Sequence, residues 1–464
     1  MENENKSNLT KKYGLLTATC MIVGTVIGSG IFFKSEEMAR AIGGRIELGI
    51  LAWVIGGLIM LGLVYTFSVL ATRHEKCNGL VDYADAVVGK KYGYMLGWFL
   101  AVIFWPSITG ILAFVSARFS LILVGFAPAT AGFQPETFML AGLYIVAVHA
   151  MNYISPKIGG KFQISATVIK IIPLILMAIA GLIVGLVNGT TVSNVEIGLL
   201  PSAVDSPPFY LALVATAFAF AGWDAPFTMN SEIKNSKRNL PIAMVGGGII
   251  IVIIYLAYYI GMFGAAPAGV MAGGGTRIGF ENVFGNAMGT ILYVFVIISC
   301  LGTLNGCTMG AQRGLYSLAI RKKGPAPEIM SQVDSKTNVP GNSATIGLML
   351  SVAWLFAFGG HQAGWWTLPL SNLVVILHSA MLIPVLIGMM IKQKDLKWWN
   401  RYLAPAVTVI GVSFMVYALA DILKMTLVWF MVVVAIIMVV GVLFYIPAQC
   451  YKAALAKMGI KCKT

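Results

Sequence analysis

Two short stretches of this 464-residue sequence combine glycine with polar residues inside long apolar runs. The first, GTVIGSGIF (residues 24–32), has three glycines and a serine within nine residues. The second, AGWDAPF (residues 221–227), places Gly222, Asp224 and Pro226 within five residues. A glycine lowers the stability of a helix interior by about 1 kcal/mol, and proline lacks the amide hydrogen that a helix interior needs. We therefore expect a helix to be interrupted at each of these stretches.

An interrupted helix offers backbone groups that can bind a charged ligand. Free N–H groups at the start of its second half carry partial positive charge, and free C=O groups at the end of its first half carry partial negative charge. The amides of Gly28, Ser29 and Gly30, with the serine hydroxyl, would suit a carboxylate. The carbonyl groups that would suit an ammonium lie near the two breaks, at Val26, Ile27, Phe218 and Ala221. The two breaks, the second of which contains Gly222, thus predict a site for a zwitterionic amino acid head group and leave the ligand's side chain open.

Two ionisable residues inside the apolar runs are further candidates. Lys170, in VIKIIP (168–173), either extends its amine to the nearby membrane surface or has a function within the membrane. We favour the second interpretation, because intramembrane ionisable residues are functional by default. Asp224 either caps the second half of its interrupted helix, which we prefer, or takes up a proton during function.

The sequence shows no pattern typical of a metal site, a cofactor site or an enzyme. CxxC and HExxH spacings are absent, and the histidines at positions 74, 149, 361 and 378 are far apart. An enzyme would need His, Asp or Glu clustered at one membrane face, and no such cluster is visible. We expect no cofactor, no bound metal and no enzymatic activity.

The elements that must position these residues are membrane-spanning helices. The chain is 58% hydrophobic and 11% charged with a mean hydropathy of +0.84, whereas soluble domains are about 25% charged. Apolar runs of roughly 20 residues can cross the ~30 Å hydrocarbon core of a bilayer. About twelve such runs are predicted, near residues 15–33, 48–70, 95–125, 137–154, 165–187, 209–232, 240–263, 284–312, 343–358, 366–391, 403–421 and 425–447. The sequence therefore predicts an all-α polytopic membrane protein.

The two breaks fall at matched positions of two five-helix units, in the first and sixth predicted spans. An odd number of spans inverts the second unit relative to the first, and interrupted helices at matched positions of inverted repeats indicate a transporter site at the midplane. Gly24 and Gly28 could instead form a helix-packing pair, which would explain these two glycines but neither the Ser29-Gly30 pair that follows nor the second break. The predicted divisions are an N-terminal segment (1–14), a first repeat (15–190), a second repeat (205–391), helices 11 and 12 (400–447) and a C-terminal segment (448–464).

The distribution of basic residues orients the predicted helices. With an even number of spans, 25 of the 32 Lys and Arg residues lie on the side of both termini and five lie on the opposite side. This bias follows the positive-inside rule, so both termini are predicted to be cytoplasmic, and the net charge of +14 does not indicate nucleic-acid binding. None of the six cysteines falls in a predicted external loop, so we expect no structural disulfide. The polar N-terminal segment predicts no removable signal peptide.

These motifs resemble those of the amino acid–polyamine–organocation (APC) transporters, and within them the L-type amino acid transporter (LAT) branch with its bacterial homologues. The resemblance covers nearly the whole chain. It rests on GTVIGSGIF, VIKIIP, CLGTLNG (300–306) and FAFAGWDAPFTMNSEIKNSKRNLP (218–241), of which the last is the most specific. It implies ten helices in two inverted repeats, plus two further helices, with helices 1 and 6 discontinuous. It also implies alternating access, usually with obligatory exchange of one amino acid for another.

The resemblance also implies roles for single residues. Residues 28–30 match the carboxylate-binding stretch and residues 26–27 the carbonyl stretch. Phe218 falls where the family has an aromatic gate, although such a residue is more often simply core. Asn305 matches a polar position near the substrate cavity, with an interhelical hydrogen bond as the alternative. Lys170 is expected to reach the broken first helix and span 8, where sodium-coupled relatives hold a cation, which would make sodium unnecessary.

The sequence hypothesis is a sodium-independent exchanger of small neutral amino acids (Ala, Ser, Thr, Cys or Gly) in a bacterial cytoplasmic membrane. The substrate preference comes from similarity to bacterial members that share LNG and FWPSITG. The alternative is proton-coupled transport of larger, cationic or polyamine substrates. A channel or a carrier-like receptor is a further class, but the asymmetric chain does not suggest the ring-like assembly of a channel.

Two loops depart from the family pattern. Animal members of the branch join a single-span glycoprotein through an external cysteine after span 3. The corresponding loop here, GFAPATAGFQPE (125–136), has no cysteine, so no disulfide-linked heavy chain is expected. The loop after span 2 retains little of the family pattern, so the sequence leaves the cytoplasmic gate unassigned.

Overall fold

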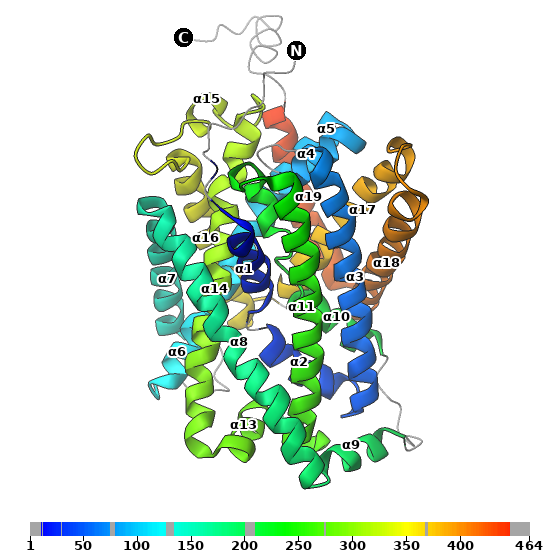
Figure 1. The fold of residues 1–464 in the computed structure, drawn as a ribbon. Helices are drawn as coiled ribbons and strands as arrows, with labels where there is room; N and C mark the ends of the chain where they lie inside the picture. Colours follow the sequence, from blue (N-terminus) through cyan, green and yellow to red (C-terminus); the bar gives the residue numbers. More distant parts are fainter. Residues whose placement is uncertain are drawn as a thin grey trace, which may run out of the picture.

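The computed structural model describes residues 11, 13–28, 30–74, 79–126, 134–199, 209–272, 275–366 and 370–445. These residues form a bundle of long helices that run between two opposite ends of the molecule (Figure 1). They include no β-strand, and a single isolated bridge pairs Tyr13 with Ile233. The prediction of an all-α polytopic membrane protein is confirmed.

Among the described residues, ten helices are long and apolar enough to cross a membrane. They are α3 (Ile46–Arg73), α5 with η1 and α6 (Lys90–Phe99, Leu100–Phe104, Trp105–Leu123), α7 (Pro135–Ile154), α8 (Pro156–Val187), α11 (Ser236–Ala265), α14 (Asn286–Ala319), α16 (Gly341–Gln362), α17 (Leu370–Lys392), η3 with α18 (Trp399–Leu403, Ala404–Leu423) and α19 (Met425–Tyr445). The shorter elements are α1 (Leu15–Val26), α2 (Gly30–Ala41), α4 (Gly79–Val87), α9 (Thr190–Leu199), α10 (Tyr210–Ala219), η2 (Ala225–Glu232), α12 (Ala268–Ala272), α13 (Thr276–Phe284) and α15 (Pro327–Met330).

The two predicted interruptions lie in the first and sixth predicted spans, which are not among these ten helices. α1 and α2 are long and apolar enough to cross a membrane only when taken together, and the chain bends by 43° between them. In the predicted sixth span, α10 ends after ten residues, and the 3₁₀ helix η2 follows. Discontinuity of the first and sixth segments is therefore present, while the count of twelve spans remains a prediction. The short helices α4, α9, α12 and α13 were not predicted.

A stripe of glycines lets α14 lie close to its neighbours. These glycines recur every fourth residue and so lie on one face of the helix. A Cβ atom on Gly306 would lie 2.4 Å from the Thr25 hydroxyl of α1, and one on Gly310 would lie 2.6 Å from the Trp105 ring of α6. Such small-residue stripes are how membrane helices approach closely. The stripe consists of Gly302, Gly306, Gly310 and Gly314.

A short π-helix in the third span has an identifiable cause. Pro106 has no amide hydrogen, so the carbonyl of Val102 loses its helical partner. The backbone widens to a π-helix over Leu100–Phe104, and the indole of Trp354 on α16 donates to the Val102 carbonyl at 2.8 Å. Polar backbone at membrane depth is thus satisfied by a neighbouring helix. The α6 segment that follows contributes Ile108 and Leu112 to the central cavity.

Candidate functional site

The first break lies at the centre of the bundle, where α1 ends at Val26 (Figure 1). Ile27 leaves the helical conformation with φ −69° and ψ 98°, although its N–H still donates to the Val23 carbonyl. α2 resumes at Gly30. The predicted break is therefore present, and Ser29, a predicted ligand, lies outside the described residues.

Lys170 of α8 closes this break. Its Nζ donates to the Gly24 and Ile27 carbonyl oxygens at 2.6 Å each and to the Thr303 hydroxyl of α14 at 3.3 Å. The side chain is fully buried, so the interpretation that it extends to the membrane surface is wrong. The alternative was favoured because intramembrane ionisable residues are functional by default, and the contacts match the position that the family resemblance implies: the ammonium lies between the broken first helix and α14.

The second break faces the first. After α10 ends at Ala219, Gly222 takes up a left-handed conformation (φ 87°), which favours glycine. A Cβ atom there would also lie 2.8 Å from the Thr25 side chain of α1. The predicted break in AGWDAP therefore lies against the end of the first helix.

Tyr255 of α11 joins the two breaks, and sequence analysis did not identify it. Its hydroxyl lies 3.0 Å from the Val26 carbonyl and 3.0 Å from the Ala219 carbonyl, the last residues of α1 and α10. One hydroxyl proton can serve only one of the two acceptors at a time. The available signal was a tyrosine inside an apolar run, YLAYYIGMF (255–263), but it does not distinguish Tyr255 from its neighbours.

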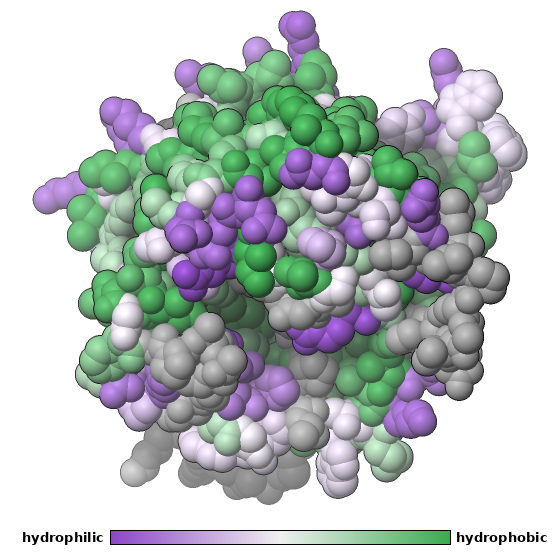
Figure 2. Space-filling model, turned by 90° about the horizontal axis from the view of Figure 1, so that it is seen from below, coloured by the Kyte–Doolittle hydropathy of each residue, from purple (hydrophilic) through white to green (hydrophobic). Residues whose placement is uncertain are grey.

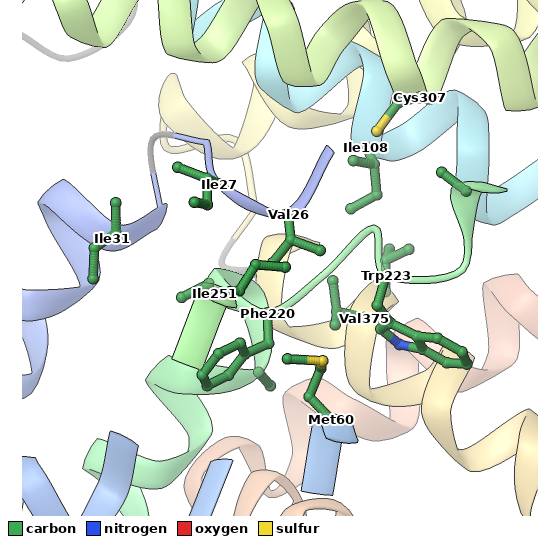
Figure 3. Packing of buried hydrophobic residues seen from close by; sticks show 14 of the residues in the cluster. Val26, Ile27, Ile31, Met60, Ile108, Phe220, Trp223, Ile251, Cys307 and Val375 are labelled. Carbon is green, nitrogen blue, oxygen red and sulfur yellow. The ribbon is translucent and has the colours of Figure 1, made fainter. Parts of the chain in front are cut away.

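A small cavity of about 20 Å³, the inner cavity, lies between the two breaks. Figure 3 shows Val26, Ile108 and Cys307 near the interrupted backbone. Six predicted site residues and five others line the cavity. They are Val26, Gly28, Gly30, Phe218, Ala221 and Gly222, together with Thr25, Ile108, Leu112, Thr303 and Cys307.

The predicted site residues Ile27, Lys170, Asp224 and Asn305 do not line the inner cavity. The Ile27 carbonyl accepts from Lys170, and the Val26 carbonyl lies within hydrogen-bond distance of Tyr255, so each retains one lone pair at most for a ligand. The Phe218 carbonyl accepts from the Ala221 amide.

Asn305 lies on a different face of α14 from the cavity. Thr303 and Cys307 line the cavity, four residues apart, whereas Asn305 lies about 200° around the helix from Thr303. Its amide nitrogen donates to Gln163 Oε1 at 2.8 Å and the Gly159 carbonyl at 3.2 Å, and its oxygen accepts from Asn152 at 2.8 Å. The interhelical hydrogen bonds that the sequence left as the alternative are therefore present.

Asp224 is buried and is the N-cap residue of η2, but its side chain accepts no capping hydrogen bond, so the preferred role as a cap remains a prediction. The second residue of η2 is Pro226, which has no amide hydrogen, and the amide of Phe227 donates to the Asp224 carbonyl instead. Its carboxylate lies 3.4 Å from His378 Nε2 of α17, without a hydrogen bond. The histidine ring stacks on Phe104, with ring centroids 4.0 Å apart.

A larger cavity of about 690 Å³, the vestibule, opens at the end of the molecule where α2 and α13 lie. Figure 2 looks onto this end, where hydrophilic side chains border a hollow. Phe218 and Gly30 line both the vestibule and the inner cavity, so Phe218 lies at the boundary between them. Lys34 lies 5.5 Å above the Phe218 ring, within cation–π range. The charged residues of the vestibule are Lys34, Arg40, Arg118, Arg277, Glu36 and Glu37.

The opposite end of the bundle is crossed by a buried ion pair. Arg313 of α14 donates to Glu232 at 2.8 Å, and both side chains are buried. Glu232 is the acidic residue of the EIKN motif that follows the second break. The Tyr13 amide donates to the Glu232 carbonyl, so the start of the described chain joins this contact. The Glu232–Arg313 ion pair therefore stabilises the end of the bundle at which the sequence left the cytoplasmic gate unassigned.

Among the residues that the structure describes, no group of three or more His, Cys, Asp or Glu side chains could hold a metal ion. The chemistry available around the inner cavity is therefore that of backbone groups, two hydroxyls, a thiol and apolar side chains.

Comparison with known proteins shows that the chain is similar to amino acid transporters. A family model described as amino acid permease matches residues 13–454. The serine/threonine exchanger SteT of Bacillus subtilis is 28% identical over 75% of this chain and 76% of its own length. The b(0,+)-type amino acid transporter 1 of Oryctolagus cuniculus is 26% identical over 75% and 74%. The glutamate/serine transporter AimA of B. subtilis is 26% identical over 76% and 67%.

Proposed function

The chain belongs to the amino acid permease family, and on this premise we propose that it exchanges small neutral L-amino acids across a bacterial cytoplasmic membrane without sodium. That it is a multi-pass amino acid transporter, and not an enzyme, follows from the family and its relatives. Exchange, the substrate and sodium independence are the proposed part. The proposed architecture is two inverted five-helix repeats followed by two helices, with both termini cytoplasmic.

The observation that carries the proposal is the position of the Lys170 ammonium. It occupies the space between the carbonyls of Gly24 and Ile27 and the Thr303 hydroxyl, all of them oxygen ligands. Oxygen donors of this kind suit a hard cation such as sodium. A fixed ammonium at the same place supplies the positive charge permanently, so transport needs no bound sodium.

The two breaks supply the substrate site. The backbone around Gly28 and Gly30 would hold the α-carboxylate, and remaining lone pairs at the ends of α1 and α10 would hold the α-ammonium. The inner cavity leaves little room beyond this head group, which favours a small side chain. The serine/threonine exchanger among the relatives supports the same substrate class.

Phe218 would act as the gate between this site and the vestibule. It lines both cavities, so rotation of its ring would open or close the path between them. Given the positive-inside bias, the vestibule faces the exterior and the Glu232–Arg313 pair closes the cytoplasmic side. Alternating access would then require this ion pair to separate. No disulfide-linked heavy chain forms part of the proposal; most of the loop concerned lies outside the described residues.

Counterflow in proteoliposomes tests the proposal. Vesicles loaded with unlabelled serine should take up labelled serine several times faster than empty vesicles, equally in sodium and potassium buffers. A panel of alanine, threonine, cysteine, glycine, leucine, glutamate and arginine as internal substrates defines the specificity. If internal amino acid does not accelerate uptake, the exchange mechanism is wrong. If uptake requires sodium, the role given to Lys170 is wrong.

A second candidate function is proton-coupled transport, of these or of larger or cationic substrates, and the Asp224–His378 contact favours it. A buried carboxylate without a hydrogen bond, 3.4 Å from an imidazole, is an arrangement that can take up a proton. Asp224→Asn separates the two functions, because abolished pH dependence with intact substrate binding would support coupling.

A further inference from the structure

A third cavity lies away from the substrate path, where α14 ends near the start of α5. It has a volume of about 180 Å³. It lies at the end of the bundle that also contains α4 and α15, the upper end in Figure 1. We call it the headgroup pocket, and its polar lining consists of Asp85, Lys90, Tyr94, Arg321, Lys322 and Lys323.

The charges of the headgroup pocket do not balance. Arg321 pairs with Asp82 and, at 3.5 Å, with Asp85, so two carboxylates offset its charge. Lys90 and Lys322 are exposed, and neither forms an ion pair with another residue of the described chain. The pocket therefore carries an excess of positive charge that suits an anion.

Lys322 occupies a position where glycine would be expected. It follows the end of α14 with φ 57°, the left-handed conformation that usually ends a helix with glycine. The Lys323 amide donates to the Leu318 carbonyl, which completes the helix end around it. A lysine in this conformation is less favourable than glycine, so its presence indicates that the side chain has a functional role.

Aromatic residues place the headgroup pocket at the membrane surface. The Tyr94 hydroxyl donates to the Gly441 carbonyl of α19 at 2.8 Å, and Trp98 donates to the Ile437 carbonyl at 2.9 Å. Lys323 lies 4.0 Å above the Tyr445 ring at the end of α19. Tyrosine and tryptophan gather at the level of lipid headgroups.

The neighbouring surface of α19 is apolar and exposed. Val439 and Leu443, which precede Tyr445 by six and two residues, are 61% and 52% exposed. In a membrane this surface contacts acyl chains. A single lipid could therefore place its chains along α19 and its headgroup in the pocket.

We propose that the headgroup pocket binds the phosphate of an anionic phospholipid. Lys90, Lys322 and Lys323 supply ammonium donors to the phosphate oxygens, as in other basic pockets between membrane helices on the cytoplasmic side. The site is separate from the inner cavity, so the inference does not depend on the proposed substrate or mechanism. The bound phosphate group could belong to a lipid headgroup or to a free phosphate ion, and the test distinguishes these two sources.

The test is native mass spectrometry of the purified, delipidated full chain titrated with phosphatidylglycerol or phosphatidylcholine. Phosphatidylglycerol should bind more tightly than phosphatidylcholine. The double variant Lys90→Ala/Lys322→Gly should weaken phosphatidylglycerol binding about 25-fold, at about fivefold per lysine, and leave phosphatidylcholine binding unchanged. Glycine at position 322 suits the local conformation, so this variant should melt at the temperature of the wild type or higher.

The matched control is Lys161→Ala/Lys237→Ala, which removes two exposed lysines from the starts of α8 and α11, outside the headgroup pocket. Unchanged binding in the control is expected. Equal weakening in both double variants, or equal binding of the two lipids, would overturn the proposal. A third titration adds millimolar inorganic phosphate, and displacement of phosphatidylglycerol by it would show that the pocket serves a free anion instead.

Discussion

The two interrupted helices occupy matched positions in the chain but are stabilised in different ways. At the end of α1, the carbonyls of Gly24 and Ile27 accept from Lys170, and Tyr255 reaches Val26. At the second break the polar group is Asp224, which is buried without a hydrogen bond from another described residue. The first break contains a cation with its acceptors, and the second contains a carboxylate without donors.

This difference indicates which break is fixed and which can change. A buried ammonium with short charge-assisted hydrogen bonds holds its surroundings in one arrangement. A buried carboxylate without donors is costly and gains from any rearrangement that supplies a proton or a partner. We infer that the end of α1 is the rigid half of the site and that the segment after α10 is the adjustable half.

The largest effect is expected from Lys170→Met, which keeps the length of the side chain and removes its charge. Two carbonyl groups would lose hydrogen bonds to a charged donor, worth about 1.5–3 kcal/mol each. Counterflow should fall by about 100-fold or more, because a loss of about 3 kcal/mol corresponds to slightly more than two factors of ten. The melting temperature of the purified protein should fall as well.

The matched control for this variant is Lys161→Met, on the exposed part of the same helix. It should change neither counterflow nor the melting temperature appreciably. If Lys170→Met transports at the wild-type rate, the first break is not held by the lysine and the comparison between the two breaks is wrong.

The next largest effect is expected from Gly28→Ala, which tests how tightly the first break is packed. The new Cβ atom would lie 2.7 Å from the Thr303 hydroxyl, and such overpacking costs about 1–3 kcal/mol. Serine counterflow should fall about tenfold or more, and Gly28→Ala/Thr303→Ala should recover part of the loss. Gly142→Ala is the control, because nothing lies within 4 Å of the Cβ position there. If Thr303→Ala gives no recovery, steric contact with Thr303 is not the cause.

The sequence predicted the breaks well because their signal is local. Glycine and proline within a few residues of an apolar run disfavour a helix wherever that run lies, so GTVIGSGIF and AGWDAP could be interpreted without a fold. The all-α class followed from hydropathy alone. The packing interpretation of Gly24 and Gly28 also holds, since Cβ atoms there would contact Thr167 and Thr303. One stretch can therefore interrupt a helix and allow close approach.

The direction in which a side chain faces was harder to predict. Asn305 was included because LNG matches a family position near the substrate cavity, whereas Thr303 and Cys307 lie on the face that lines the inner cavity. Single-sequence reasoning cannot determine the rotation of a helix whose whole circumference is apolar. Asp224 was expected to cap the second half of its helix, and it is the N-cap residue of η2. Its side chain makes no capping hydrogen bond, because Pro226 has no amide hydrogen and the Phe227 amide donates to the Asp224 carbonyl.

A smaller effect is expected from Tyr255→Phe, which tests whether the two breaks are coupled. The variant removes the hydroxyl that lies between the Val26 and Ala219 carbonyls, a change worth about 0.5–1.5 kcal/mol for each hydrogen bond lost. The turnover rate should change by a few-fold with little change in KM. Tyr259→Phe, one turn later on α11, is the control because its hydroxyl has no hydrogen-bond partner within the described chain. Equal effects of the two substitutions would argue against coupling through Tyr255.

The smallest effect on stability is expected from Asp224→Asn, the counterpart of Lys170→Met at the second break. Asparagine has nearly the same shape and removes a buried charge that has no hydrogen bond, so the melting temperature should stay the same or rise. Serine counterflow, measured from pH 5 to 8 with the same pH on both sides of the membrane, should keep the wild-type profile if the protein is an exchanger that needs no proton.

A profile that is pH-dependent in the wild type and flat in the variant, with serine binding intact, would instead identify Asp224 as a coupling residue. A large fall in melting temperature would show that the carboxylate is stabilised after all, and the contrast between a rigid first break and an adjustable second break would then fail.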